Sequence, residues 1–339
     1  MASVNGTRPR VLLLGVIELA HSAWASVASA ADILTPTSTD RASFLAEASS
    51  GAFDGCTVAY RTFESFSVTG RVDGELLSAL PPSLRFICHN GAGYDQVDVP
   101  ACTARGIRVS NTPSAVDDAT ADMAMFLLLG ALRNLAVGMA SLRAGQWRGA
   151  TPPALGHDPQ GKVLGILGMG GIGRNMAKKA LAFGMKIRYS NRTRLDPSVE
   201  KEIEAEYVDF KTLLAESDVL SLNLPLNSNT RRIISSNEFA AMKKGITIVN
   251  TARGGVMDEA ALVEALSSGQ VNSVGLDVYE EEPKIHPGLL ENPRVLLVPH
   301  MGTYTVETHQ KMEEWAISNV AMALESRQLR SIVPEQSDM

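Results

Sequence analysis

The chain has 339 residues, of which 45% are hydrophobic and 20% charged, and 31 Lys and Arg against 37 Asp and Glu give a net charge of −6. This length exceeds one ordinary domain and fits two. The composition excludes a disordered or fibrous chain, and the mildly acidic balance argues against a protein that wraps nucleic acid or lies on an anionic membrane. No apolar run reaches the ~20 residues of a membrane helix.

Cys56, Cys88 and Cys102 show neither the spacing of metal ligands nor that of a disulfide framework. Cysteines of this kind are typical of reduced compartments. We therefore expect a cytoplasmic protein and identify no metal site in the sequence.

The apolar run 11–17 near the N-terminus permits two interpretations. Preceding arginines and the small-residue segment 28–30 resemble a secretory signal and its cleavage site. Glu18 and His21 interrupt that pattern. We favour a buried strand that leads into a helix.

Short apolar runs alternate with helical periodicity along the whole chain, which predicts an α/β protein with parallel sheets wound through βαβ crossovers. The predicted strands are Val11–Ile17, Thr57–Tyr60, Leu84–Cys88, Ile107–Ser110, Val163–Leu167, Lys186–Tyr189, Val219–Leu224, Ile246–Asn250, Ser273–Leu276 and Val295–Val298.

One long helical pattern runs from about Val116 to Arg143 and ends before Gly145. It is apolar on nearly every side, so it must be covered on several faces. Either it is a central core helix of its own domain, or a second subunit covers it. The pattern alone does not favour one over the other.

A glycine-rich turn joins the predicted strand 163–167 to a helix over 174–183, and a second strand follows at βαβ distance. This is the context that a dinucleotide-binding G-x-G-x-x-G motif requires. The glycines permit a tight turn and a close approach of backbone to pyrophosphate, and the helix N-terminus supplies free N–H groups. The residues of this turn that we expect to bind the cofactor are Gly168, Gly170, Gly171, Ile172 and Gly173.

The end of the second strand indicates which nicotinamide cofactor is used. NAD sites place an acidic residue there, but residues 174–195 contain none. The strand instead runs into Ser190, Asn191, Arg192 and Thr193, which we predict to bind the 2′-phosphate of NADP(H). NAD(H) remains possible. The alternative is that the arginines bind no phosphate and only keep a surface loop solvated.

Three further segments follow predicted strands, where open α/β sheets place their ligands: Thr251–Gly255, Asp277–Pro283 and Pro299–Thr303. Together with the glycine turn and Asn90–Asp98, they resemble the D-isomer-specific 2-hydroxyacid dehydrogenase family over nearly the whole chain. Within it, the sequence is most similar to glyoxylate/hydroxypyruvate reductases and fungal D-mandelate dehydrogenase-like members.

The resemblance implies two Rossmann-like, doubly wound parallel-sheet domains with a cleft between them. Residues 1–111 with 302–339 would form the substrate domain, and residues 112–301 the dinucleotide-binding domain. The helix that starts near Val116 would match the dimerisation helix of the family, which implies a homodimer.

The chemistry required is hydride delivery to a keto carbon and proton delivery to its oxygen. His300 suits the proton transfer, with Glu282 orienting its ring. Arg253 would hold the substrate carboxylate or carbonyl and polarise it. The N–H groups of Ala92 and Gly93 would bind the other carboxylate oxygen.

The resemblance also implies cofactor contacts and exposes departures from the family pattern. The further contacts are Pro225, Thr251, Ala252, Asp277 and Gly302. Tyr304 stands where small residues are usual, and Asp122 replaces a more common Glu. Tyr304 either contacts the substrate or only packs, and we interpret His89, beside the carboxylate loop, as structural.

We therefore expect an NADPH-dependent reductase of a small 2-oxo acid such as glyoxylate or hydroxypyruvate, giving the D-2-hydroxy acid. One alternative is a dehydrogenase for a bulkier, mandelate- or arylpyruvate-type acid. The other is a nucleotide-sensing interaction protein like the corepressors that share this fold. Glu282 argues against a formate dehydrogenase, in which Gln takes that place.

Overall fold

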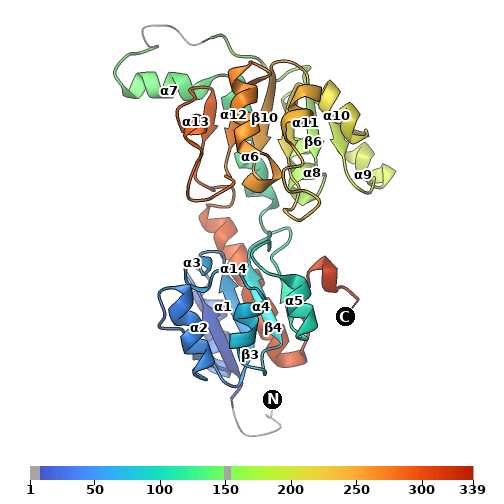
Figure 1. Cartoon of the computed structure of the whole chain (residues 1–339). Helices are drawn as coiled ribbons and strands as arrows, with labels where there is room; N and C mark the ends of the chain where they lie inside the picture. Colours follow the sequence, from blue (N-terminus) through green and yellow to red (C-terminus); the bar gives the residue numbers. More distant parts are fainter. Residues whose placement is uncertain (1–7, 149–153, 339) are drawn as a thin grey trace. The chain divides into compact units, whose positions relative to one another are not determined.

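The computed structural model describes residues 8–148 and 154–338 and contains two compact units (Figure 1). The first is Met1–Val116 with Thr305–Met339, and the second is Asp117–Tyr304. Each has its own parallel sheet, so the predicted α/β fold class with two doubly wound domains is confirmed. The roles of the two units stay a prediction.

The first unit contains a parallel sheet in the order β2-β1-β3-β4-β5. Its strands are β1 (Arg10–Leu14), β2 (Asp32–Leu34), β3 (Cys56–Thr62), β4 (Phe86–Asn90) and β5 (Arg108–Ser110). The strand order reverses between β1 and β3, and in open α/β sheets ligands bind beyond the carboxyl ends of the strands at such a switch point.

Helices cover both faces of this sheet because each face is apolar. Helices α1 (His21–Ala30) and α14 (Val306–Ser326) pack on one face, around Val58 and Tyr60. Helices α2 (Arg41–Ser49), α4 (Gly74–Ala79) and α5 (Val99–Ala104) pack on the other. The short helix α3 (Phe66–Thr69) and the 3₁₀ turn η2 (Pro334–Gln336) complete the unit.

The second unit contains a parallel sheet in the order β12-β11-β10-β9-β6-β7-β8. Its strands are β6 (Val163–Leu167), β7 (Lys186–Ser190), β8 (Ala205–Tyr207), β9 (Val219–Leu222), β10 (Ile246–Asn250), β11 (Val271–Leu276) and β12 (Val295–Leu297). The order reverses between β6 and β9, which is the dinucleotide-binding arrangement.

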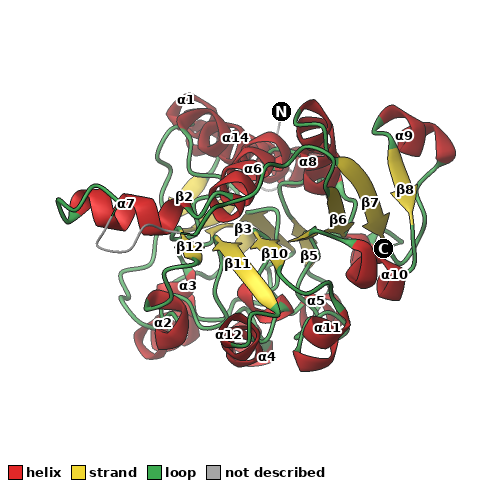
Figure 2. Cartoon of the chain, turned by 90° about the horizontal axis from the view of Figure 1, so that it is seen from above, coloured by secondary structure: helices red, strands yellow, loops and turns green. Residues whose placement is uncertain are grey.

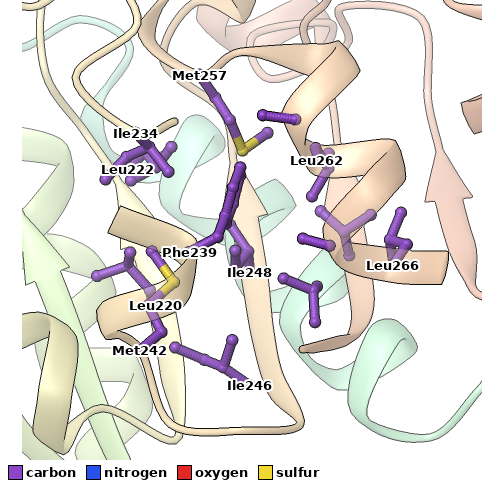
Figure 3. Close-up of a cluster of buried hydrophobic side chains, with 14 of the residues drawn as sticks. Leu220, Leu222, Ile234, Phe239, Met242, Ile246, Ile248, Met257, Leu262 and Leu266 are labelled. Atoms are coloured by element: carbon purple, nitrogen blue, oxygen red, sulfur yellow. The ribbon is translucent and has the colours of Figure 1, made fainter. Parts of the chain in front are cut away.

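Figure 2 shows α6 and α8 on one side of this sheet and α11 and α12 on the other. The helices of the unit are α6 (Asp117–Leu132), α7 (Leu135–Arg143), α8 (Gly171–Ala182), α9 (Pro197–Glu202), α10 (Phe210–Glu216), α11 (Ser236–Ala241), α12 (Glu259–Ser267) and α13 (Pro287–Leu290), with a 3₁₀ turn η1 (Gly254–Val256). In one of its cores, Phe239 of α11 packs with Ile248 of β10, with Leu262 of α12 and with Met257, which precedes α12 (Figure 3).

The helix expected over residues 116–143 is two helices. The chain breaks after Leu132, and Asn134 adopts a left-handed conformation with φ 52°. Helix α6 is largely buried within its own unit, against α8, β10 and β11, so the core-helix alternative holds for it. Helix α7 projects from the unit (Figure 1) and exposes Leu135, Met139 and Leu142.

The strand interpretation is confirmed for the first part of the run 11–17, which forms β1 (Arg10–Leu14), paired with β2 and β3. The strand ends three residues earlier than predicted, and Val16 is exposed. Within the described ranges, no single helix has both the length and the apolar character to cross a membrane. One bent pair in the described part of the chain, α6 and α7, which meet at 80°, passes that test when the two helices are taken together.

Candidate active site

The turn between β6 and α8 has the conformation that the glycine motif predicts. Gly168 has φ +98°, and a Cβ there would lie 2.7 Å from the carbonyl oxygen of Asn223. Gly173 allows α8 to approach the turn, because a Cβ there would lie 2.5 Å from the Gly168 carbonyl oxygen. A Cβ on Gly170 would meet no other atom within 4 Å. The space beside this glycine is therefore not filled by protein and is open to a ligand. These are the separate roles that glycines have in dinucleotide sites.

Two buried polar atoms without partners lie at the carboxyl ends of neighbouring strands in this unit. Thr251 Oγ1 follows β10, and Asn223 Oδ1 follows β9, and neither has a hydrogen-bond partner within the described structure. Buried polar groups are normally hydrogen-bonded, so such unpaired atoms at the carboxyl ends of the strands fit a site for a polar ligand. The residues present therefore fit a bound dinucleotide. Asn223 is an addition to the residues that the sequence identified.

The end of β7 is tied to the glycine turn. The Gly168 N–H donates to the Ser190 carbonyl oxygen at 3.1 Å, and the Met169 N–H donates to Asn191 Oδ1 at 2.6 Å. Arg192 and Thr193 follow and are exposed. No ion-pair partner for Arg192 exists among residues 8–148 and 154–338. The predicted 2′-phosphate residues thus lie at the end of β7 and in the loop that follows it, beside the turn.

Arg194 has a different environment from Arg192. Its guanidinium makes two hydrogen bonds to Glu200, at 2.8 Å and 2.7 Å, and Tyr189 also donates to that carboxylate. The hydrogen bond from Arg194, followed by that from Tyr189, lowers the pKa of Glu200 to about 2. Glu200 is therefore ionised at neutral pH and its charge is matched by Arg194, which braces the loop.

His300 and Glu282 form a hydrogen-bonded pair, with His300 Nδ1 2.8 Å from Glu282 Oε2. Glu282 Oε1 accepts the Tyr279 N–H at 2.9 Å. Burial alone would raise the pKa of Glu282, but the hydrogen bond and charge of His300, the Tyr279 N–H and the charge of Arg253 outweigh it and lower that pKa. An ionised carboxylate only accepts, so the proton between the pair is on Nδ1.

Arg253 follows β10 and is held at its backbone. Asn250 accepts the Ala252 N–H at 3.0 Å through Oδ1 and donates to the Arg253 carbonyl oxygen at 3.0 Å through Nδ2. The Arg253 charge also lowers the pKa of Glu282, so these side chains are electrostatically coupled. The second unit therefore brings the three predicted catalytic residues, Arg253, Glu282 and His300, to one region.

Asp277 supports the loop that carries His300. Both carboxylate oxygens accept backbone N–H groups, Oδ1 from Met301 and Oδ2 from Gly302, the latter at 2.7 Å. The side chain is buried, and burial raises the pKa of Asp277 against the opposing N–H bonds. His300 has a left-handed backbone with φ 53°, a conformation that such surrounding bonds sustain. The predicted cofactor contact of Asp277 stays a prediction.

The predicted carboxylate loop of the first unit follows β4, and its first carbonyl groups point to protein donors. Gly91 O accepts the Thr112 N–H at 3.0 Å, and Ala92 O accepts Asn111 Nδ2–H at 2.8 Å. Within the described residues no acceptor faces the N–H groups of Ala92 and Gly93. Successive free N–H groups of this kind make an anion-binding concavity.

The remaining predicted residues lie at loop positions. Pro225, two residues beyond Asn223, accepts the Thr230 hydroxyl at its carbonyl oxygen at 2.6 Å. Tyr304 is 68% exposed and closes a turn onto Met301 through its N–H. Across residues 8–148 and 154–338, no cluster of three or more His, Cys, Asp or Glu side chains is arranged to hold a metal ion.

Comparisons with known proteins agree with this geometry. The family model described as D-isomer specific 2-hydroxyacid dehydrogenase, NAD binding domain, matches residues 125–302. The chain is 54% identical to 4-methyl-2-oxopentanoate reductase A of Aspergillus oryzae over 98% of this chain and 99% of that protein.

Two solved structures share the fold over nearly their full length. A glyoxylate reductase from Paecilomyes thermophila has a TM-score of 0.93 at 52% identity, covering 96% of this chain and 98% of that one. The holo form of Rhodotorula graminis D-mandelate dehydrogenase has a TM-score of 0.90 at 31% identity, with the same coverage of 96% and 98%. These matches confirm the resemblance drawn from the motifs, and the chain belongs to the D-isomer specific 2-hydroxyacid dehydrogenase family.

Proposed function

We propose that this oxidoreductase uses NADPH to reduce a small 2-oxo acid, of the glyoxylate or hydroxypyruvate type, to the D-2-hydroxy acid. The observation that carries the proposal is the His300–Glu282 hydrogen bond of 2.8 Å, formed in the unit that also contains the dinucleotide turn and Arg253. A proton donor, an electrophile and a nucleotide site are the three components that carbonyl reduction by hydride requires.

Bound NADPH would supply the hydride that forms the new C–H bond at the keto carbon. His300 gives its Nε2 proton to the keto oxygen as the C=O π-bond breaks, and solvent then reprotonates the ring. Glu282 holds Nδ1–H and stabilises the imidazolium before transfer. Arg253 binds the carboxylate or carbonyl oxygen and stabilises the negative charge that develops there. The N–H groups of Ala92 and Gly93 bind the substrate carboxylate in this account.

The preference for NADPH rests on the loop after β7. Ser190, Asn191, Arg192 and Thr193 would hold the 2′-phosphate, with Arg192 as the charged ligand, because Glu200 already engages Arg194. The glycine turn from Gly168 to Gly173 would hold the pyrophosphate at the start of α8. Pro225, Thr251, Ala252, Asp277 and Gly302 complete the cofactor contacts.

A bulkier 2-oxo acid is the second candidate substrate. It is favoured by the 54% identity to a protein named 4-methyl-2-oxopentanoate reductase A and by the fold shared with a D-mandelate dehydrogenase. Tyr304, as an exposed aromatic four residues after His300, is the side chain that would contact the larger substrate.

The experiment is a steady-state panel of glyoxylate, hydroxypyruvate, 4-methyl-2-oxopentanoate and phenylglyoxylate, each with NADPH and NADH. The proposal predicts the highest kcat/KM for the two small acids with NADPH. The highest kcat/KM for the branched or aromatic acids would favour the second candidate. No turnover of any acid, together with tight nucleotide binding, would contradict both and favour a nucleotide-sensing protein.

We also propose a homodimer, with α7 in place of α6 as the helix that a second subunit covers. Leu135, Met139 and Leu142 of α7 are exposed, as is Trp147 beyond it. An exposed apolar surface of this kind marks a protein interface. Changing Leu142 to Glu is expected to yield monomers in sedimentation, whereas a monomeric parent protein would contradict the proposal.

A further inference from the structure

Arg61 is a fully buried arginine that none of the proposed chemistry uses. It lies at the end of β3 with 0% of its surface exposed. Burial lowers the pKa of Arg61 to about 10, with the charges of Asp95 and Glu64 opposing that shift, so the guanidinium stays protonated at neutral pH. Buried charges are costly unless they are hydrogen-bonded, so the contacts of Arg61 indicate what it does.

Those contacts lead to the predicted carboxylate loop. Arg61 is the register partner of His89 on the neighbouring strand β4, and one terminal nitrogen lies 3.1 Å from His89 Nδ1. Its other terminal nitrogen donates to Gln96 Oε1 at 2.7 Å. His89 Nε2 in turn lies 3.0 Å from the Gly93 carbonyl oxygen. His89 thus contacts the Ala92–Gly93 loop at Gly93, and Arg61 contacts it further on, at Gln96.

Donor and acceptor chemistry fixes the protonation of His89. A guanidinium only donates, so Nδ1 of His89 must accept and carries no proton. Nε2 then carries the proton and donates to the Gly93 carbonyl. The imidazole is held neutral and in a single tautomer by its neighbour on β3.

The consequence for the loop follows from the planarity of the peptide group. Holding the Gly93 carbonyl toward His89 fixes the Gly93–Tyr94 peptide plane, directly after the Gly93 N–H. The Ala92 and Gly93 N–H groups lie in the two preceding peptides, whose carbonyls Thr112 and Asn111 hold. A Cβ on Gly91 would lie 2.6 Å from His89 Nε2, so the loop is packed directly on the imidazole. With its carbonyls turned to the protein, the loop has its Ala92 and Gly93 N–H groups left for an anion.

We infer that Arg61 and His89 are positioning residues, which orient the Ala92–Gly93 loop for the carboxylate of the substrate without touching the reacting atoms. This inference rests on the proposed function and extends it to residues outside the catalytic set. If this is so, loss of either residue should raise KM and leave kcat nearly unchanged. The reason is that a misoriented carboxylate loop weakens the binding of the substrate and of the transition state equally.

Matched substitutions separate this role from a general structural one. Gln keeps an amide N–H near the position of Nε2, whereas Asn does not reach it. We expect His89→Asn and Arg61→Met to raise KM for the 2-oxo acid about tenfold, the worth of a lost hydrogen bond, with kcat within about twofold. His89→Gln should restore KM to within about threefold of the parent value. Phe44→Leu, a buried change elsewhere in the first unit, should lower Tm and leave KM unaltered.

Calorimetric titration of oxalate into each protein in the presence of NADP⁺ provides a readout that does not depend on turnover. The inference predicts that oxalate affinity falls in His89→Asn and Arg61→Met and is retained in His89→Gln. Unchanged oxalate affinity and unchanged KM in folded His89→Asn would overturn the inference. If Arg61→Met does not fold, the His89→Asn variant alone decides the test. A parent protein that binds oxalate yet reduces no 2-oxo acid would contradict the proposed function and leave the positioning role supported.

Discussion

His300 Nδ1 lies 2.8 Å from Glu282 Oε2, and the other carboxylate oxygen of Glu282 accepts the Tyr279 N–H at 2.9 Å. Both carboxylate oxygens of Glu282 are therefore engaged, and the hydrogen bond to Nδ1 orients the His300 ring. This arrangement makes the pair the centre of the proposed chemistry.

Removal of the imidazole tests the proton-donor role. We expect His300→Ala to lower kcat by about 10²- to 10⁴-fold, the usual contribution of a positioned acid, while nucleotide affinity stays within a few-fold of the parent. Stopped-flow measurement of NADPH oxidation and nucleotide titration by fluorescence report the two quantities. His21→Gln, a change of an exposed histidine, serves as the control. A kcat within tenfold of the parent in His300→Ala would rule out the role.

The glycine turn offers two substitutions with opposite expected effects. Gly170→Ala adds a methyl group that meets no protein atom within 4 Å, so Tm should stay unchanged while nucleotide affinity falls by about tenfold or more. Gly173→Ala places its methyl 2.5 Å from the Gly168 carbonyl oxygen and should lower stability, by about 1–3 kcal/mol as in other overpacked sites. Thermal unfolding and nucleotide titration measure both. Full nucleotide affinity in Gly170→Ala would contradict the assignment of the pyrophosphate site.

Arg192 and Arg194 should differ in what they do for the cofactor. Arg192→Ala is expected to lower kcat/KM for NADPH by about 10- to 100-fold, which corresponds to the loss of a charged hydrogen bond. The value of kcat/KM for NADH should be nearly unaltered. Arg194→Ala breaks the brace to Glu200 and should weaken the use of both cofactors. An equal fall in kcat/KM for NADPH and NADH in Arg192→Ala would contradict the assignment of the 2′-phosphate pocket. Arg71→Ala is the control for loss of an exposed arginine.

The pKa of Glu200 predicts how its contribution to stability varies with pH. Its folded-state value of about 2 is below the ~4.3 of an unfolded glutamate, so the stabilisation is fully present above about pH 4.3 and is lost as the pH falls toward 2. Glu200→Gln should therefore lower Tm at pH 7, and its difference from the parent should shrink at pH 3. Glu325→Gln, an exposed control, should show no such difference. A pH-independent Tm difference for Glu200→Gln would show that the ionised carboxylate is not what stabilises the loop.

Much of the fold was predictable because buried parallel strands are continuous apolar runs. The strands Val163–Leu167 and Ile246–Asn250 have the predicted bounds. Strands β2 and β8 were missed, since three-residue edge strands that are only partly buried have no such run. The break at Asn134 was also missed, because the apolar periodicity continues across it and only the left-handed backbone interrupts the helix.

The motifs placed the three predicted catalytic residues after strands, where the structure also has them, whereas the supporting residues needed the structure. Arg61 and His89 are separated by 28 residues and meet only through the register of β3 and β4, which a single sequence does not specify. Asn223 became a cofactor candidate only when its Oδ1 proved to be buried without a partner. Apolar patterning predicts which segments are buried, and it carries no information on which polar side chains meet between them.

The central claim is that this chain reduces a 2-oxo acid with NADPH and transfers the hydride to one face. The most direct test is to incubate the parent protein with hydroxypyruvate and NADPH and to measure both cofactor consumption and the chirality of the product. The account predicts one D-glycerate formed for each NADPH oxidised, at a rate that falls by at least about 10²-fold in His300→Ala. No NADPH consumption with this or any other 2-oxo acid, or a product of L configuration, would contradict it.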